Sequence, residues 1–562
     1  IKINPNYEGA YNNLGALYQE SGQNQNAISC YEKSIEIDPK HINFLNNLSC
    51  LLKTFTYDNK TEANKDNLKK FLLTLFRNNN ISHQNIVEHV KLLLFTANEQ
   101  NQLRKVINSD TLLENQALLS SLKEELFYLM LQKSIVSDKF LEKLLTQFRY
   151  EILLNLENFN KINLTEHFNL IMSLAEQCWL NEYVYTQSKI EIDKISKLKN
   201  KIESNNKINE LEIATLGTYI PLNSSEIIIN KLLDYKSSNV LFNDLINVQI
   251  KEPLKEKEII KSIRSLDIID DDVSKKVRKQ YEENPYPRWK FTHKYLPHNF
   301  FKCLNREIEP NRVDYNNQIN NPNVLIAGCG TGNHSIQATK YKNSNILAVD
   351  LSLTSLAYAK RKTEELGYKN IEYLHADILQ LNRLNKKFDI VESVGTLHHM
   401  KNPITGLKIL LDMLEPHGFL KLGLYSETAR QNVVKAREAI KERNYKNTTK
   451  DIKHFRQDIL DEKVNPLIQN VSVFTDFYST SMVRDLLFHI QEHRFTIPQI
   501  SKILNDLDLE FLGFSTTPLI KKKFSELFPN DKKNISLDNW HKFEIDNPFT
   551  FLTMYQFYIR RK

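Results

Sequence analysis

The sequence predicts a multidomain protein in which an all-α N-terminal part precedes an α/β domain with a parallel, doubly wound sheet. Between residues 67 and 260, apolar residues recur at helical spacing and glycine is almost absent. Beyond residue 263, short apolar runs alternate with helical segments, which is typical of parallel sheets. A chain of 562 residues is also too long for one hydrophobic core, so several domains are expected.

Composition and charge narrow the class of protein. The 75 basic and 68 acidic residues give a net charge of +7 that no short segment concentrates, so a nucleic-acid partner is not expected. The five cysteines are scattered and no histidine cluster has zinc spacing, so we expect no metal site and a reducing, cytoplasmic environment. No apolar run reaches the length of a membrane span, and no membrane association is expected.

Residues 1–58 carry one helical repeat. The proline-containing dipeptide Asn4-Pro5 has an equivalent in Asp38-Pro39. The spacing of 39 − 5 = 34 residues is the period of the tetratricopeptide repeat, which this segment resembles. Since the chain starts at Ile1 without an initiator methionine, we interpret the segment as the remnant of a longer array. One repeat cannot bury its own face, so it must pack on the helices after it or on further repeats. The residues that match the repeat pattern are Tyr11, Leu14, Gly15, Tyr18, Ala27, Tyr31 and Pro39.

Residues 59–262 are predicted to form a helical domain. Within it, the run Ala175–Tyr183 combines polar groups with aromatic residues. Two interpretations fit this run: an internal polar network, or a surface that meets the next domain. We favour the first, because polar clusters between packed helices are commoner than binding sites.

A glycine-rich turn marks the start of the α/β core. Residues 323–327 form an apolar run bounded by proline and glycine, as expected of a buried parallel strand. Gly328, Gly330 and Gly332 follow, and a helix is expected from about His334. Glycines here let the backbone turn sharply and approach a ligand without a Cβ clash. Asp350 ends the next strand, 350 − 330 = 20 residues further on, where a carboxylate can accept both hydroxyls of a ribose.

The spacing of the glycines separates two kinds of ligand. A dinucleotide fingerprint needs a third glycine at position 333, where this chain has asparagine. The turn therefore favours a nucleoside that carries no pyrophosphate. After the third strand, Asp377 and the backbone N–H of Ile378 can bind an adenine edge.

Seven strands and a helical insertion are expected between residues 263 and 562. The last crossover helix is placed at 496–507, where Thr496 and Pro498 form an N-terminal start signal. The final two strands should be antiparallel, and a charged helical insertion at about 426–495 decorates the core. The predicted strands are 323–327, 346–349, 371–374, 388–391, 419–424, 511–514 and 551–559.

The order of strand, glycine turn, two acids, Leu-His-His turn and Pro-x-Gly-strand resembles the Rossmann-like core of class I S-adenosylmethionine-dependent methyltransferases. The resemblance implies S-adenosylmethionine as cofactor. It places the glycines beside the methionine moiety, Asp350 at the ribose, and Asp377 with Ile378 at the adenine. The expected cofactor-binding residues are Gly328, Gly330, Gly332, Asp350, Leu351, Asp377, Ile378 and Ser393.

The candidate catalytic groups follow the fourth strand. A base is needed only if the methyl acceptor must first lose a proton, and His398, His399 and Glu392 are placed to provide one. The alternative for each histidine is a structural hydrogen bond in the core. No zinc-binding cysteine set is present to activate a thiol.

The substrate side of the site is expected in two other segments. Tyr281, Tyr286 and Trp289 lie in a proline-stiffened run before the first core strand, which we interpret as a lid or substrate-site wall. The alternative is an aromatic staple onto the helical domain. His489 and His493 in the insertion could line the acceptor pocket or belong to a solvated helix face.

The whole chain resembles a bacterial group of tetratricopeptide-repeat/methyltransferase fusions. The likeness is carried by the repeat, by the Glu176–Tyr183 run, by the Asn284–Trp289 run and by the glycine turn. It implies a fold and a cofactor but supplies no acceptor. Three functions remain open: an enzyme that methylates a protein recruited by the helical part, a small-molecule methyltransferase whose repeats serve assembly, and a binding module without catalysis.

Overall fold

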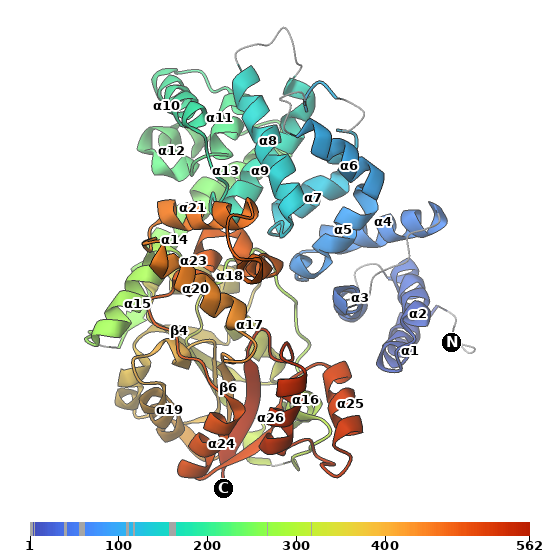
Figure 1. Cartoon of the computed structure of the whole chain (residues 1–562), viewed down its shortest axis with the longest axis vertical. Coiled ribbons are helices and arrows are strands. Elements are labelled where there is room, and N and C mark those ends of the chain that lie inside the picture. Colours follow the sequence, from blue (N-terminus) through green and yellow to red (C-terminus); the bar gives the residue numbers. More distant parts are fainter. Residues whose placement is uncertain are drawn as a thin grey trace.

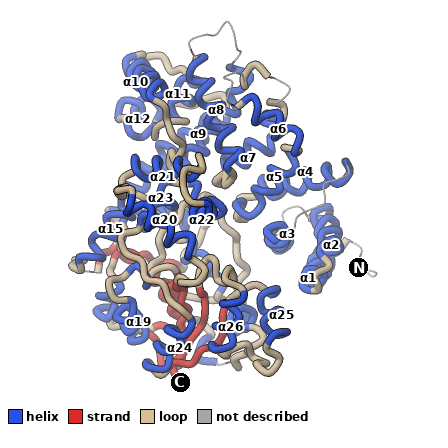
Figure 2. Tube along the Cα trace, in the orientation of Figure 1, coloured by secondary structure: helices blue, strands red, loops and turns tan. Residues whose placement is uncertain are grey.

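The computed structural model describes residues 4, 6–38, 42–54, 62–107, 112–115, 119–156, 164–266, 268–315 and 317–562. A helical N-terminal part lies above an α/β domain (Figure 1), and the strands lie together in that lower part (Figure 2). Among these described residues, no helix is both long enough and apolar enough to cross a bilayer.

The repeat forms a close helix pair. Gly15 of α1 (Glu8–Glu20) faces Tyr31 of α2 (Asn24–Ile37), and a Cβ on Gly15 would come within 2.7 Å of the Tyr31 ring. Ala27 is fully buried. The small residues of the repeat pattern are therefore needed where the helices cross, while Pro5 and Pro39 lie outside the described residues.

The repeat and the helical domain share one apolar core, which runs without interruption from Ala27 to Ile250. The prediction that a single repeat must pack on neighbouring helices is therefore confirmed. The helices that build this core after α2 are α3 (Ile42–Thr54), α4 (Glu62–Arg77), α5 (Val87–Leu94), α6 (Ala97–Val106), α7 (Glu125–Lys133), α8 (Lys139–Asn155), α9 (Phe168–Leu180), α10 (Lys189–Ser204), α11 (Glu210–Gly217), α12 (Glu226–Leu232), α13 (Val240–Ile246) and α14 (Glu252–Ile260).

The α/β domain is built on one sheet with the strand order β1-β4-β3-β2-β5-β6-β8-β7. All pairs are parallel except those of β8, which is antiparallel to both β6 and β7. The strands are β1 (Arg264–Ser265), β2 (Asn323–Ala327), β3 (Asn345–Asp350), β4 (Ile371–His375), β5 (Phe388–Val394), β6 (Leu414–Leu424), β7 (Leu509–Phe514) and β8 (Tyr555–Arg561).

The expected count of seven strands is wrong by one. The extra strand, β1, has only two residues, both exposed, and pairs with the edge of β4. An exposed arginine and serine carry no apolar pattern, so nothing in the sequence marks them as a strand. The seven predicted strands are all present, and the antiparallel end of the sheet is as expected.

Helices cover both faces of the sheet, and alternate residues of β2 enter two different cores. Leu325 packs with α19 (Pro403–Asp412) and α24 (Ile497–Asp506) on one face. Ile326 packs with α16 (Phe300–Ile308) and α18 (Leu353–Glu365) on the other. The helices of this domain are α15 (Asp272–Glu283), α16 (Phe300–Ile308), α17 (Asn333–Gln337), α18 (Leu353–Glu365), α19 (Pro403–Asp412), α24 (Ile497–Asp506), α25 (Pro518–Leu527) and α26 (Leu537–Asp546).

The insertion lies between the sheet and the helical domain (Figure 1) and consists of α20 (Gln431–Glu442), α21 (Thr449–Leu460), α22 (Pro466–Gln469) and α23 (Thr480–Phe488). Its apolar core includes Ile135 and Leu180 of the helical domain. Buried charges tie the same interface, because Arg456 donates two hydrogen bonds to Glu142, one of them at 2.6 Å. The insertion therefore joins the two halves of the chain.

The run Ala175–Tyr183 contributes to this interface as well as to the helical core. Gln177 stays inside the helical domain, where its side chain accepts from the Val136 N–H at 3.0 Å. Glu176 instead pairs with Lys290 at 2.6 Å, and Glu182 accepts from the Ser481 N–H at 2.7 Å. The preference for a purely internal network is thus wrong for these two acids, which meet segments of the α/β domain.

Candidate active site

The glycine turn after β2 is as sharp as the sequence predicts, and its three glycines have left-handed backbone. Gly328, Gly330 and Gly332 have φ values of 82°, 53° and 87°. A Cβ on Gly330 would come within 2.5 Å of the Tyr286 carbonyl oxygen, because that segment lies directly on the turn. The turn and the Tyr286 segment are therefore packed as one unit, and only glycine fits at position 330.

Asp350 ends β3 beside this turn. Its Oδ2 accepts from the Gly330 N–H at 2.8 Å, and its Oδ1 accepts from the Ser352 N–H at 2.9 Å. Burial raises the pKa of Asp350 to about 6, and these N–H donors oppose that rise only in part. The carboxylate is thus held at a fixed angle, with oxygen lone pairs left for a ligand.

A cavity of about 380 Å³ opens at the carboxyl ends of the strands, where ligands of such sheets bind. It is bounded by the glycine turn, by the ends of β3 and β5, and by the segment that follows α15. The predicted site residues that line it are Gly328, Gly330, Asp350, Leu351, Asp377, Ile378, Tyr281, Tyr286 and His399.

Four of the other predicted residues support the site from outside the cavity lining. Ser393 is buried, donates to the Ala327 carbonyl at 3.1 Å and lies outside the cavity lining. Trp289 donates from Nε1 to the Thr331 hydroxyl at 3.0 Å and thereby holds the glycine turn from behind. Gly332 packs against α18. His493 Nε2 lies 3.0 Å from Gln491 Nε2.

Two of the candidate bases are also buried outside the lining. His398 is fully buried and stacks on Tyr425 with ring centroids 3.8 Å apart. Glu392 accepts from His334 Nε2 at 2.6 Å and from the Tyr341 hydroxyl at 2.5 Å. Neither side chain reaches an acceptor in the cavity in this arrangement.

His399 is the candidate base that does line the cavity. Its Nδ1 donates to the Gln491 carbonyl at 2.8 Å, so Nε2 carries the free lone pair. Burial lowers the pKa of His399, which keeps the ring neutral near pH 7. A neutral imidazole with one fixed N–H is the form that a general base requires.

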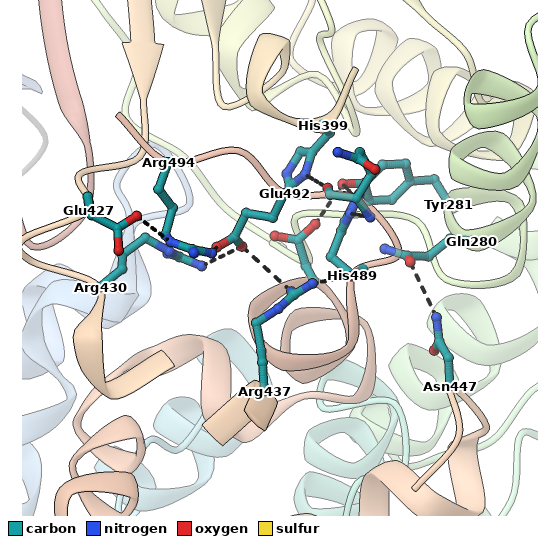
Figure 3. A network of polar contacts seen from close by, with 12 residues as sticks. Gln280, Tyr281, His399, Glu427, Arg430, Arg437, Asn447, His489, Glu492 and Arg494 are labelled. Atoms are coloured by element: carbon teal, nitrogen blue, oxygen red, sulfur yellow. Dashed lines mark hydrogen bonds and ion pairs between the residues drawn. The ribbon is translucent and has the colours of Figure 1, made fainter. Parts of the chain in front are cut away.

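His399 belongs to a cluster with Asp485 and His489, whose ligand-type atoms lie within 4.8 Å of one another. The Tyr281 hydroxyl donates to Asp485 at 2.6 Å. The same hydroxyl lies 3.1 Å from His489 Nε2 (Figure 3). The two imidazoles are stacked at 3.6 Å and 22°, so their in-plane lone pairs run side by side and do not converge. The Gln491 N–H donates to His489 Nδ1, which places the hydrogen of that ring on Nε2. We therefore interpret the cluster as hydrogen-bonded and assign it no metal.

Charged residues of the insertion hold the segment that carries His489 in place (Figure 3). Arg430 donates to Glu492 at 3.0 Å, and Arg494 donates to Glu427 at 2.9 Å. Arg437 donates to the His489 carbonyl at 2.6 Å. The segment after α23 is thereby fastened to α20 and to the end of β6.

Sequence reasoning missed several residues of the cavity. His334 is the second residue after the glycine turn, so its proximity to that turn could have marked it. Lys421 lies within a strand, and Met554 and Gln556 come from the region of β8, more than 200 residues away along the chain. No local pattern links these positions to the turn.

Two family models match the chain. One describes a methyltransferase domain and covers residues 324–418, which includes the glycine turn, Asp350 and Asp377. The other describes a tetratricopeptide repeat and covers residues 9–41. Both matches fall on the segments that the sequence predicted for these modules.

Curated relatives match only part of the chain. An uncharacterized protein of Synechococcus is 33% identical over 125 residues, which are 22% of this chain and 30% of that protein. An uncharacterized protein of Rickettsia prowazekii is 28% identical over 141 residues, 25% of this chain and 54% of that protein. A ubiquinone biosynthesis O-methyltransferase of Actinobacillus pleuropneumoniae is 27% identical over 143 residues, 24% of this chain and 60% of that protein. The chain thus spans less than two thirds of these relatives.

Among solved structures, PKMT2 from Rickettsia typhi in complex with AdoHcy is 17% identical with a TM-score of 0.38. The alignment covers 50% of this chain and 55% of that chain.

The parallel sheet with its antiparallel end and the glycine turn facing Asp350 define a class I methyltransferase domain, and the family match to residues 324–418 agrees. S-adenosylmethionine is the cofactor of this class, as the sequence predicts. The chain therefore carries a tetratricopeptide repeat at residues 9–41 and a methyltransferase domain that includes residues 324–418.

Proposed function

We propose that the chain is a methyltransferase that transfers the methyl group of S-adenosylmethionine to an acceptor in the cavity. One observation carries this proposal. The buried Asp350 carboxylate is fixed by the glycine turn at 2.8 Å and faces a cavity lined by Asp377 and Ile378. The family match to a methyltransferase domain supports the same conclusion.

The residues present fit the cofactor. Asp350 would hold the ribose hydroxyls, because an ionised carboxylate accepts two hydrogen bonds from neighbouring hydroxyls. Asp377 and Ile378 line the next part of the cavity, and Asp377 is fixed there by the Leu379 N–H at 2.9 Å. The glycine turn leaves the backbone open to an aminoacyl tail. When bound, S-adenosylmethionine supplies a methyl group that its sulfonium already activates.

This chain positions the acceptor and removes its proton. Tyr281, Tyr286 and Tyr425 form an aromatic wall of the cavity, which excludes water around the reacting groups. His399 lines the same wall and can take a proton on Nε2, since Nδ1 remains bound to the Gln491 carbonyl. The imidazolium formed in this way is stabilised by the nearby Asp485 carboxylate.

For the acceptor we favour a protein recruited by the helical part. The repeat hairpin exposes Tyr7 and Leu17, at 53% and 61%, and repeats of this kind present peptide-binding surfaces. A small-molecule acceptor is the second candidate, because the aromatic wall encloses a cavity of limited volume.

Transfer of a tritiated methyl group into lysate, followed by size fractionation, tests these alternatives. We expect label in macromolecules with the wild-type chain and at least about tenfold less with Asp350→Asn, which keeps the size of the side chain. Label in the low-mass pool would instead support a small-molecule acceptor. If neither pool is labelled although S-adenosylhomocysteine binds, the chain is a binding module and the proposed reaction is wrong.

A further inference from the structure

A group of exposed basic residues lies on the α/β domain outside the cavity. Lys302 and Arg306 are four residues apart on the exposed side of α16, and His298 and Lys342 lie beside the start of that helix. None of the four lines the cavity. We refer to these four residues as the α16 basic surface.

Backbone contacts and helix geometry bring these residues together. The His298 N–H donates to the Lys340 carbonyl at 2.7 Å, and the Lys342 N–H donates to the His298 carbonyl at 2.8 Å. On a helix, residues four apart have Cβ atoms about 5–6 Å from each other, so Lys302 and Arg306 lie on the same side of α16. The four side chains therefore occupy one continuous part of the surface.

The α16 basic surface carries a positive charge. Within the part of the chain that the structure describes, no acid forms an ion pair with Lys302, Arg306 or Lys342, and Glu307, the neighbouring acid on α16, binds two other lysines at 2.6 Å each. Partial burial lowers the pKa of His298, and the charges of Lys302 and Arg306 lower it further. An anionic group bound here would relieve the repulsion between these cations.

The surface continues into the helical part of the chain through Lys294, which is also exposed. The Lys294 N–H donates to the Asn80 carbonyl at 2.9 Å, and the Lys294 carbonyl accepts from Asn46 Nδ2 at 3.0 Å. Asn46 belongs to α3, which shares an apolar core with the repeat helix α2. A polypeptide bound along the repeat helices can therefore continue over Lys294 onto the α16 basic surface.

The spacing of the cations on α16 fits an extended acidic peptide. In an extended chain, side chains on the same side belong to every second residue, and the rise of about 3.3 Å per residue places them about 6.6 Å apart. This spacing is close to that of Lys302 and Arg306 on their helix turn. Acidic residues at alternate positions can thus reach both cations at once, whereas consecutive acidic residues point to opposite sides.

We propose that the α16 basic surface docks an extended segment of a protein partner that carries acidic residues at alternate positions. The link to α3 favours a polypeptide over a nucleic acid, because helical repeats present surfaces that bind peptides. That the docked partner is the methyl acceptor rests on the proposed function. The docking itself rests on the charges and contacts of the surface alone.

Fluorescence anisotropy with the full chain and labelled octapeptides tests the docking. In the first peptide glutamate and serine alternate, in its block isomer four glutamates precede four serines, and in a third peptide glutamine replaces glutamate. We expect the alternating peptide to bind about twofold to tenfold more tightly than the block isomer, because each additional exposed ion pair contributes up to about fivefold. The glutamine peptide should not bind, and added salt should weaken the binding of the alternating peptide.

Charge reversals locate the binding. The double variant K302E/R306E replaces two attractive contacts by repulsive ones, so we expect the alternating peptide to bind at least about tenfold more weakly. The matched control is K401E/K408E, since Lys401 and Lys408 are exposed at α19, which packs on the opposite face of the sheet from α16. This control changes the net charge equally and should keep the affinity within about twofold. Thermal unfolding should report folded protein for both double variants.

Four outcomes would overturn the proposal. Equal losses in the two double variants would mean that net charge alone attracts the peptide. Equal affinities for the alternating peptide and its block isomer would contradict the spacing argument. Tighter binding of a single-stranded oligouridylate of the same charge, lost in K302E/R306E, would assign the surface to nucleic acid. Tighter binding of vesicles that contain phosphatidylserine, lost in the same variant, would assign it to a membrane.

Transfer of a tritiated methyl group separates this proposal from the proposed function. If the docked partner is the acceptor, K302E/R306E should lower the label in macromolecules while its affinity for S-adenosylhomocysteine stays at the wild-type value. Unchanged label in that variant would show that the docked partner is not the acceptor. If the wild-type chain transfers no methyl group, the proposed function fails, and the peptide measurements still decide whether the surface docks an acidic segment.

Discussion

Asp350 is the residue on which cofactor binding depends most directly. We expect Asp350→Asn to weaken the binding of S-adenosylhomocysteine by about tenfold to a hundredfold, because an amide offers one acceptor oxygen where the carboxylate offers two. The fold should survive, since burial of this charge already disfavours the folded state, as its raised pKa shows. Calorimetry and thermal unfolding measure the two effects. Asp389→Asn, near the start of β5 and outside the cavity lining, is the control, and an unchanged affinity for Asp350→Asn would contradict the assigned site.

The pKa of Asp350 also predicts how binding depends on pH. It is raised from 3.8 to about 6, so the carboxylate becomes protonated as the pH falls through 6. A protonated acid loses an acceptor, and the affinity for S-adenosylhomocysteine should fall by up to about tenfold per pH unit below 6. Asp350→Asn should lack this dependence between pH 7.5 and 5. A wild-type affinity that stays constant over the same range would show that Asp350 binds no hydroxyl.

The sequence was informative for residues at strand ends and uninformative for residues whose partners are distant in the chain. Asp350 and Asp377 could be found because each follows an apolar run, which places it at the carboxyl edge of the sheet. Glu392 satisfies the same rule, yet it binds His334 and Tyr341, which no local pattern reveals. Gln556 reaches the cavity only because β8 returns antiparallel beside β6.

Among the elements, strands with a buried apolar run could be predicted within a few residues, and the helix start at Thr496 could be predicted from Thr496 and Pro498, where the structure adds a capping box with Gln499. The beginning of β6 could not, because Leu414–Leu424 includes the proline, histidine and glycine that usually mark a turn. The pairing with β5 shifts register here, because Phe388 pairs with Leu414 and Ile390 pairs with Phe419, so the extra residues lie in β6. The strand β1 could not be predicted from its residues, because it pairs with β4 only as a result of where the chain places it in the fold.

The insertion and α8 are joined by the buried pair Arg456–Glu142, which leaves 1% and 6% of the two side chains exposed. We expect Arg456→Met to destabilise the protein by about 3–5 kcal/mol, because Glu142 would remain buried without its partner. Denaturant unfolding measures this loss. Arg443→Met provides the matched control, since its pair with Asp458 is exposed and worth less than about 1 kcal/mol. Adding Glu142→Leu should restore much of the stability, and a double variant as unstable as Arg456→Met would contradict this account.

At the level of the whole molecule, every residue that lines the cavity lies between Ser274 and Gln556. A fragment of residues 263–562 should therefore bind S-adenosylhomocysteine within about tenfold of the full chain. Its Tm should be lower by about 5–10 °C, because the insertion loses the apolar contacts of Ile135 and Leu180. Calorimetry and thermal unfolding measure both effects, with a fragment of residues 62–562 as the control that retains those contacts. A folded short fragment without affinity would mean that the helical domain completes the cavity.

The pairing of the helical domain with the insertion also has a consequence during synthesis. Glu182 can bind the Ser481 N–H only after the ribosome has added Ser481, 299 residues later. At about 5–20 residues per second, this face of the nascent chain stays open for roughly 15–60 s. The acidic groups of this face remain hydrated during that interval. They therefore disfavour aggregation through the apolar neighbours Ile135 and Leu180, which the insertion has not yet covered. Ribosome profiling and chaperone capture would thus report engagement that ends once α23 has emerged.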